Sequence, residues 1–462
     1  MMSGECWRDP CPFFLMIGIY NCNKVILKLI ELKMHKIFKQ YSKLNKLTKH
    51  RFIRNSIWSI IDQVLGLTLA LLITIALARQ FGPTELGKYI LAISLTSLIS
   101  VLTNLGIQTA VKRVIAKDPK KTEEYLGQAI AIRFIFSLPM SCLCVQAAAI
   151  ILAYDRDLIV ICHIANLFIF FSGLIALNAA VLTSLHLSKK VLLFNIIYRL
   201  GILVLLILVV ITHSTINSYL FGMAVVGLFV FLMGTLDIIK QTGTLILKPK
   251  IKFCKNLVVT SFPLALAAAI EFANLKIDTL FIGSIIDEQS VGIYAAGFNI
   301  ILAFIAIPMA ITKVFFPNFI EIINSQNYSL ARNSVIKLSF VYILYSLTCT
   351  IFIFFAADIF VFVLYGEAFM ETANIIKLLA VSIPFIVLNR LYNYLLVALD
   401  FDKVLYKVIS VGLIANIALN IFLIPKFSIY GAAFATIFSE TLVLILMIII
   451  LLKYSRDQIF TS

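Results

Sequence analysis

Residues 191–211 read VLLFNIIYRLGILVLLILVVI and contain a single charged side chain, Arg199. An apolar run of this length crosses the ~30 Å hydrocarbon core of a bilayer as one helix. A buried helix of a soluble protein keeps a polar stripe, and this run has almost none. Similar runs recur along the 462 residues, of which 61% are hydrophobic and 13% charged. This composition excludes a soluble enzyme, a secreted disulfide scaffold and a disordered protein.

We expect an all-α polytopic membrane protein with about twelve transmembrane helices. Short turns separate the apolar runs, so consecutive helices should be antiparallel neighbours. The expected spans are 57–78, 89–111, 127–152, 158–183, 191–211, 217–238, 257–283, 292–316, 335–356, 374–398, 404–424 and 431–452.

The basic residues predict how the chain lies in the membrane. With the N-terminus inside, 27 of the 39 Lys and Arg residues fall on the cytoplasmic side and 4 on the outer side. Cytoplasmic loops carry such an excess, so both termini should be cytoplasmic. The net charge of +16 is spread along the chain, which argues against nucleic-acid binding. Residues 1–50 form a basic cytoplasmic extension, or the chain starts at Met34.

Two segments of the chain resemble each other at an offset close to half the length of the chain without its first 50 residues. ELGKYILA at 85–92 aligns with SVGIYAAG at 290–297, so that Gly87 matches Gly292 at an offset of 205. Because each half holds an even number of spans, the halves should be parallel repeats, with a site between them near the midplane. The expected divisions are a bundle at 51–240, a basic linker at 241–256, a bundle at 257–456 and a tail at 457–462.

One segment imitates a nucleotide-binding loop. GPTELGKY at 82–89 has the G-x-x-x-x-G-K pattern, but Tyr89 stands where that loop needs Ser or Thr for the metal ion. No strand is expected before it. We interpret the segment as a turn between two spans, broken at Gly82–Pro83.

Ionisable side chains inside the spans are the candidate functional residues, because each costs about 2.5–3.5 kcal/mol at a helix centre. Glu271, Asn274 and Asp278 are spaced i, i+3, i+7, which predicts one helix face lining a cavity between the halves. Lys276 projects from another side of that helix. Arg133, Arg199 and Lys313 alternatively reach the membrane surface with their long side chains, and Asp278 alternatively has a structural role.

The histidines and cysteines show no metal-ligand spacing, and no loop outside the membrane is large enough to hold a catalytic domain. The sequence therefore predicts no catalytic residue, no metal site and no cofactor. It predicts a transporter rather than an enzyme.

Four stretches together resemble a known family. They are RNSIWSIIDQVLGL at 54–67, ARQFGPTELGKYILA at 78–92, IDTLFIGSIIDEQSVGIYAAGFNI at 277–300 and IPKFSIYGAAFATIFSETL at 424–442. They are similar to the Wzx-type polysaccharide-biosynthesis flippases of the multidrug/oligosaccharidyl-lipid/polysaccharide exporter superfamily, over residues 51–456. The resemblance implies a V-shaped, MATE-like fold of two six-helix bundles with alternating access.

The resemblance also implies a function. Such a protein, a monomer in the bacterial inner membrane, moves an undecaprenyl-diphosphate-linked oligosaccharide to the outer leaflet for O-antigen, capsule or exopolysaccharide assembly. Membrane lipids, a polysaccharide polymerase and glycosyltransferases are the implied partners.

The family is described with a cationic central cavity. The residues expected to supply it, or to contact the sugars, are Lys276, Arg390, Asn274, Asn389, Tyr392, Arg133, Arg199 and Lys313. The acids Asp62, Glu271 and Asp278 leave a proton- or sodium-coupled step open.

Three alternatives stay open. A MATE-type multidrug antiporter exports organic cations, which the acids favour and Lys276 and Arg390 oppose. A flippase for another lipid-linked precursor would share these features. A glycan polymerase or ligase usually carries a large basic outer loop, and here the outer loops hold few basic residues.

Overall fold

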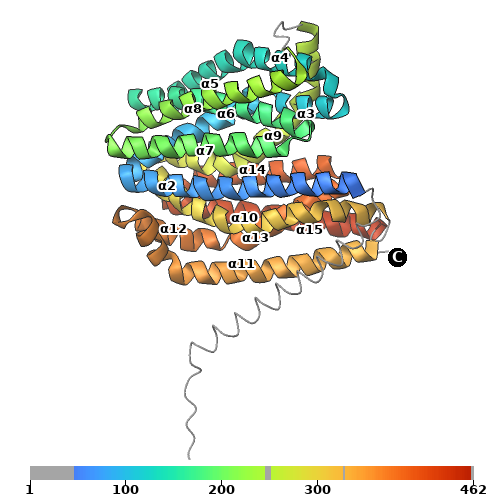
Figure 1. The fold of residues 1–462 in the computed structure, drawn as a ribbon. Helices are drawn as coiled ribbons and strands as arrows, with labels where there is room; N and C mark the ends of the chain where they lie inside the picture. Colours follow the sequence, from blue (N-terminus) through green and yellow to red (C-terminus); the bar gives the residue numbers. More distant parts are fainter. Residues whose placement is uncertain (1–45, 245–250, 326–327, 459–462) are drawn as a thin grey trace, which may run out of the picture. The chain divides into compact units, whose positions relative to one another are not determined.

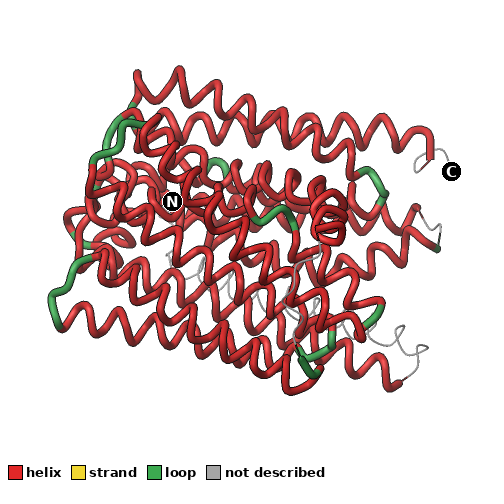
Figure 2. Tube along the Cα trace, turned by 90° about the horizontal axis from the view of Figure 1, so that it is seen from above, coloured by secondary structure: helices red, strands yellow, loops and turns green. Residues whose placement is uncertain are grey.

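The structure is a computed structural model that describes residues 46–244, 251–325 and 328–458. These residues form helices joined by short turns, and no strand occurs among them (Figure 2). Nine of the described helices are long and apolar enough to cross a membrane, or ten if one bent pair counts as a single span. The predicted all-α multi-pass membrane fold is confirmed.

The helices of the first half begin with α2, which holds the first expected span and most of the second. Their bounds are α2 Lys46–Thr103, α3 Ile107–Lys117, α4 Thr122–Ile132, α5 Leu138–Ile151, α6 Arg156–Ser184, α7 Ser188–Ile211 and α8 Ile216–Thr242. Within α2, Gly82 has φ 74° and ψ −179°, a non-helical conformation that suits glycine. The predicted break at Gly82–Pro83 is therefore confirmed.

The helices of the second half are, in order, α9 Ile251–Ile285, α10 Glu288–Asn324, α11 Tyr328–Tyr365, α12 Glu371–Ala380, α13 Ile383–Ala398, α14 Asp402–Phe427 and α15 Ile429–Gln458. The seventh expected span, 257–283, lies within α9. Short 3₁₀ turns at Pro119–Lys121 and Glu367–Phe369 precede α4 and α12.

Two expected spans, the second and the tenth, are not continuous helices, and for these the sequence prediction was wrong, whereas the third is one continuous helical span of irregular geometry. The second is interrupted after Thr103, where Leu105 and Gly106 adopt left-handed conformations with φ of 51° and 67°. The third contains a π-helical turn, η3, at Arg133–Ser137. The tenth is α12 followed by α13, bent by 48°, with a proline in the first turn of α13. Such irregular turns are tolerated at membrane depth where protein surrounds them.

The chain divides into residues 1–58 and 59–462. In the first unit, residues 46–58 are described and helical. In the second, the long helices lie side by side (Figure 1), with α6 against α7 and α8, α10 against α12 and α13, and α14 against α9 and α15. The helix α3 packs on α9 and so connects the two halves.

Large apolar side chains cover the outside of several helices. Ile151 of α5 is 80% exposed and Phe355 of α11 is 78% exposed. An exposed apolar surface of this extent is expected where lipid, not water, surrounds the protein. The expected basic extension falls mostly outside the described residues, as do part of the linker at 241–256 and the end of the tail. The division into two bundles and their V shape remain predictions.

Candidate functional site

A cavity of about 540 Å³ lies within the first half, between α2, α3, α6, α7 and α8. Pockets that hold small molecules typically measure ~300–1,000 Å³. The lining includes the polar side chains of Gln108, Lys112, Ser172, Asn195, Tyr198 and Arg199. No Asp or Glu is among the described residues of this lining, so the charges on its wall are positive.

Arg199 of α7 forms an ion pair with Asp62 of α2 beside this cavity. Its Nη1 donates to Asp62 Oδ1 at 2.7 Å and to the Asp62 carbonyl oxygen at 2.9 Å. Asn195 Nδ2 donates to the other carboxylate oxygen at 2.8 Å. Gly66 makes room for the guanidinium, because a Cβ there would lie 2.5 Å from Arg199 Nη2. Asp62, predicted for ion coupling, and Arg199, predicted for cargo binding, therefore neutralise each other.

Lys112 of α3 is the second cation of the cavity wall and was counted in the sequence only as a loop residue. Its side chain is exposed and forms no ion pair with any described residue. Because Asp62 already holds Arg199, Lys112 supplies the uncompensated positive charge of the cavity.

The second half holds a buried carboxylate. Asp278 of α9 is 6% exposed and accepts three hydrogen bonds. The donors are Asn420 Nδ2 at 2.6 Å, Thr436 Oγ1 at 2.6 Å and the Tyr294 hydroxyl at 3.0 Å. Asn416 accepts from Asn420 at 2.9 Å and extends the network along α14. The expectation that Asp278 faces a cavity between the halves was wrong, because its side chain points into the second half.

Arg390 and Asn389 of α13 also pair with carboxylates. Arg390 Nη1 lies 2.9 Å from Glu271 Oε1, with side chains 18% and 59% exposed. Asn389 Nδ2 donates to Glu440 Oε2 at 2.7 Å. The expectation that Arg390 contributes free positive charge was wrong, because Glu271 of α9 neutralises it.

Two other predicted cations stand apart from carboxylates. Lys276 is half-buried on α9 and forms no hydrogen bond or ion pair with a described residue. Two positions along a helix are about 200° apart, so Lys276 and Asp278 face nearly opposite ways. Arg133 of η3 is 1% exposed, and its Nε and Nη1 have no partner among the described residues. A Cβ at Gly173 would lie 2.7 Å from its Nη1, so the guanidinium packs directly on α6.

The remaining predicted residues are dispersed over the second half. Asn274 is half-buried on α9, and Lys313 is exposed on α10. Tyr392 packs in the apolar core, and its hydroxyl lies 3.4 Å from Ser339 Oγ. The structure does not bring these three residues to the first-half cavity.

The two halves meet through a pair of glycines. A Cβ at Gly87 of α2 would overlap the carbonyl oxygen of Glu288, and one at Gly292 of α10 would overlap that of Pro83. Each glycine thus touches the residue four positions before the other. Gly87 and Gly292 are the residues that the internal repeat aligns. If the halves are parallel repeats, such a contact between equivalent residues is expected near the axis that relates them.

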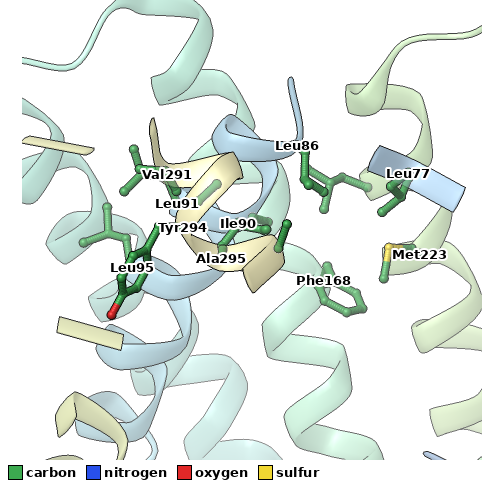
Figure 3. Close-up of a cluster of buried hydrophobic side chains, with 14 of the residues drawn as sticks. Leu77, Leu86, Ile90, Leu91, Leu95, Phe168, Met223, Val291, Tyr294 and Ala295 are labelled. Atoms are coloured by element: carbon green, nitrogen blue, oxygen red, sulfur yellow. The ribbon is translucent and has the colours of Figure 1, made fainter. Parts of the chain in front are cut away.

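Apolar side chains surround this glycine contact. Figure 3 shows Leu91 and Leu95 of α2 beside Val291, Tyr294 and Ala295 of α10. We call the contact of α2 residues 83–95 with α10 residues 288–295 the glycine seal. Next to it in the chain, Arg79 of α2 donates to the carbonyl oxygens of Val363 and Leu364 at the end of α11. The first half therefore also caps a helix of the second.

Sequence reasoning missed several polar residues of both sites. The i, i+4 pair Asn416 and Asn420 on an apolar span was the available signal for the Asp278 network. Lys112 and Asn195 gave no comparable signal, because both lie near the ends of expected spans. Glu440 stood out as an acid inside a span but had no predicted role.

These features define a multi-pass, all-α membrane protein with a positively lined cavity in one half and a buried carboxylate in the other. The family model described as polysaccharide biosynthesis protein matches residues 52–323. The chain therefore belongs to the polysaccharide biosynthesis protein family.

Known proteins support the same assignment. The capsular polysaccharide biosynthesis protein CapF of Staphylococcus aureus is 20% identical over 395 residues, which cover 85% of this chain and 97% of CapF. The lipid II flippase MurJ in an inward closed conformation is similar in fold, with a TM-score of 0.69 and 16% identity over 86% of this chain and 87% of MurJ. An inward-facing multidrug transporter of the MATE family gives a TM-score of 0.69 and 12% identity over 85% and 95%. The predicted MATE-like fold and family are confirmed.

Proposed function

We propose that the protein is a flippase for a lipid-linked oligosaccharide, moving undecaprenyl-diphosphate-linked sugars from the cytoplasmic to the outer leaflet for surface polysaccharide assembly. The observation that carries this proposal is the first-half cavity, whose wall holds Lys112 and Arg199 and no described carboxylate. A diphosphate does not cross hydrocarbon unaided, because a charge at the bilayer centre is costly. A wet, positively lined cavity lowers that cost, while the isoprenoid tail stays in the lipid.

The membrane potential supplies a driving force in the required direction. An anion moving outward across an inside-negative membrane gains ~2.3 kcal/mol per charge per 100 mV, and a diphosphate with two charges gains roughly twice that. Transport of this cargo is then favourable without ATP.

The glycine seal fits the closed gate of an alternating-access cycle. In the orientation that the basic residues predict, the turn at Gly82–Pro83 and the seal lie toward the outer face. The cavity then fills from the cytoplasmic side, where Lys112 is exposed. Release to the outer leaflet requires α2 and α10 to part at Gly87 and Gly292.

A cation bound at Asp278 is the proposed means of coupling. The carboxylate lies among amide and hydroxyl oxygens of Asn416, Asn420 and Thr436, and Asn420 Oδ1 has no partner among the described residues. Oxygen ligands of this kind suit a proton or a hard cation such as sodium. Because α9 also packs on α3, a change at Asp278 has a direct route to the first half.

A cation-exporting antiporter is the second candidate, because a MATE transporter is as similar in fold as the lipid II flippase. Such a protein needs an unpaired carboxylate in its cavity. Here Asp62 and Glu271 are both paired with arginines, and Asp278 is enclosed by hydrogen bonds. The cavity charge therefore favours an anionic cargo.

The test is to delete the gene in its host and follow the lipid-linked sugars. We expect a lipid-diphosphate oligosaccharide to accumulate where membrane-impermeant periodate cannot oxidise it, together with loss of surface glycan. Rescue by the intact chain, but weaker rescue by Lys112→Gln, would tie the effect to the cavity. Unchanged lipid-linked sugars with new sensitivity to cationic dyes would instead identify an antiporter.

A further inference from the structure

Two tyrosines line the first-half cavity next to its cations. Tyr198 of α7 precedes Arg199 in the sequence, and Tyr89 lies on α2. The Tyr89 ring packs on Tyr219 of α8, with ring centroids 6.4 Å apart at 45°. Gly227 of α8 lies behind the Tyr198 ring, where a Cβ would be in ordinary contact with Cε2 at 3.8 Å. The wall therefore presents aromatic rings held in place from behind.

The hydroxyl of Tyr198 has no protein partner at normal hydrogen-bond geometry. Tyr198 OH and Tyr219 OH are both buried without such a partner among the described residues, and the polar side chain near Tyr198 OH is Ser172, which lines the same cavity. In the second half, by contrast, the hydroxyls of Tyr294, Tyr342 and Tyr345 each bond to a carboxylate or a backbone carbonyl. Buried polar atoms are nearly always satisfied, so each exception needs an explanation. Because Tyr198 lines a cavity, an occupant of that cavity is the missing partner.

The order of groups along the cavity indicates what the occupant is. The Lys190–Asp237 pair marks one end of α7 and α8. From that end, the helical rise puts Asn195 at about 8 Å, Arg199 at about 14 Å and the lining residue Met223 at about 21 Å. Asn195 and Arg199 come first, Tyr198 lies level with them at about 12 Å, and Tyr219, with Tyr89 packed on it, lies beyond them at about 27 Å. The Tyr89 end of the cavity therefore follows the cations, as the sugars of a lipid-linked oligosaccharide follow its diphosphate, and Tyr198 lies where the two meet.

We propose that Tyr198 and Tyr89 form a subsite for the first sugars of the cargo, an inference that rests on the proposed function. A pyranose ring has an apolar C–H face that packs on an aromatic ring, and hydroxyls that bond to phenol groups. An isoprenoid chain would pack on the rings but leave the Tyr198 hydroxyl unpaired. The tyrosines therefore contact the sugar, while Lys112 holds the diphosphate.

The test compares two probes bound to the purified full-length protein in detergent. One is the lipid-linked oligosaccharide extracted from the deletion host, and the other is the same polyprenyl diphosphate without sugars. Wild-type protein should bind the sugar-bearing probe more tightly. Tyr198→Phe removes one hydrogen bond and should lower that preference about three- to tenfold, and Tyr89→Leu by about as much or more, with binding of the sugar-free probe unchanged.

If the Tyr198 hydroxyl had a structural role, Tyr198→Phe would lower thermal stability. The subsite predicts no such loss, because removing an unsatisfied hydroxyl leaves thermal stability unchanged or raises it. Tyr154→Phe is the matched control: its hydroxyl is also buried and unpartnered, but it does not line the cavity. Its probe preference should equal that of wild type.

The two proposals fail in different ways. Equal preference in wild type and both tyrosine variants would overturn the subsite and leave the flippase intact. Failure of wild type to bind either probe, with tight binding of tetraphenylphosphonium at Tyr89, would overturn the flippase itself and the subsite with it.

Discussion

Among the described residues, the most deeply buried charge of the first half is the Arg133 guanidinium, 1% exposed, whereas that of the second half is the Asp278 carboxylate, 6% exposed. Arg133 has unpartnered nitrogens, and Asp278 accepts three hydrogen bonds. Burying a charge is costly unless it is paired or hydrogen-bonded. In the second half, hydrogen bonds from the protein stabilise the buried carboxylate. In the first half, the buried guanidinium keeps nitrogens that no described residue binds. The difference points to an anion in the first half and a cation in the second.

Two similar contacts between helices differ in charge between the halves. In the first half, Asn178 donates to Thr235, between α6 and α8. In the second, Asn389 donates to Glu440, between α13 and α15. Thr235 and Glu440 are 205 positions apart, as are Gly87 and Gly292, whereas Asn178 and Asn389 are 211 apart. The contact is neutral in the first half and acidic in the second.

The glycine seal contains one glycine from each half, and the comparison of the halves predicts that substituting either glycine has the same effect on transport. Gly292→Val adds atoms where the Pro83 carbonyl lies, and the backbone has no rotamer with which to yield. We expect transport in proteoliposomes to fall more than about tenfold, because the seal no longer closes. Gly87→Val should do the same.

The control for the seal is Gly222→Ala on α8. A Cβ at Gly222 would lie 3.1 Å from the flexible end of Leu205, which can move aside. Its transport should stay near wild type. Normal transport by either valine variant would mean that the seal does not need to close during the cycle.

Asp278→Asn tests whether the second half serves the ion. The amide has one acceptor oxygen where the carboxylate has two. Asn420, Thr436 and Tyr294 then cannot all keep their hydrogen bonds, which should lower folding stability by about 1–3 kcal/mol. Transport should lose its dependence on sodium or on a pH gradient, while cargo binding stays the same. Glu440→Gln keeps the Asn389 contact and should keep the ion dependence. Ion dependence retained in Asp278→Asn would remove this carboxylate from the coupling step.

Lys112→Gln tests the opposite assignment, that the first half serves the anion. Losing one charge-assisted hydrogen bond should weaken binding of the diphosphate lipid about tenfold, and the loss should shrink as salt is added. Lys117→Gln, on the same helix α3 but outside the cavity lining, is the matched control. Equal losses in both variants would show that the charge of α3 acts only at long range.

The fold was predictable because a segment that crosses the lipid must be a long apolar helix, and runs such as 191–211 show this pattern directly in the sequence. The interruptions were not, since the left-handed turn at Leu105 and the π-helical turn at Arg133 break no hydropathy pattern. Helix spacing correctly grouped Glu271 with Asp278 on α9. It could not say which helix that face meets, and the partners of Asp278 lie 16 to 158 residues away in sequence.

Ion pairing was the decisive missing information for the site. Arg199 and Arg390 were predicted to supply a cationic cavity, with the membrane surface as the alternative for Arg199, but each pairs with an acid more than a hundred residues away. Only tertiary structure shows that these two charges are paired and that Lys112 and Lys276 form no ion pair with a described residue.

The smallest expected effects come from breaking these two pairs, and they should differ between the halves. Asp62 and Arg199 are 21% and 20% exposed, whereas Glu271 is 59% exposed beside Arg390. Glu271→Gln should therefore change folding stability by only about 0–1 kcal/mol, the usual range for an exposed pair. Asp62→Asn leaves a mostly buried guanidinium without its counter-charge and should cost about 1–3 kcal/mol.

The binding readout separates the pairs further. Asp62→Asn frees Arg199 at the cavity wall, so the diphosphate lipid should bind more tightly, about two- to tenfold for one added charge contact. Glu271→Gln frees Arg390 in the second half, away from that wall, and should leave affinity unchanged. Tighter binding by Glu271→Gln but not by Asp62→Asn would reverse the assignment and place the cargo site at α13. The reason is that affinity rises only when the released cation is the one that faces the diphosphate.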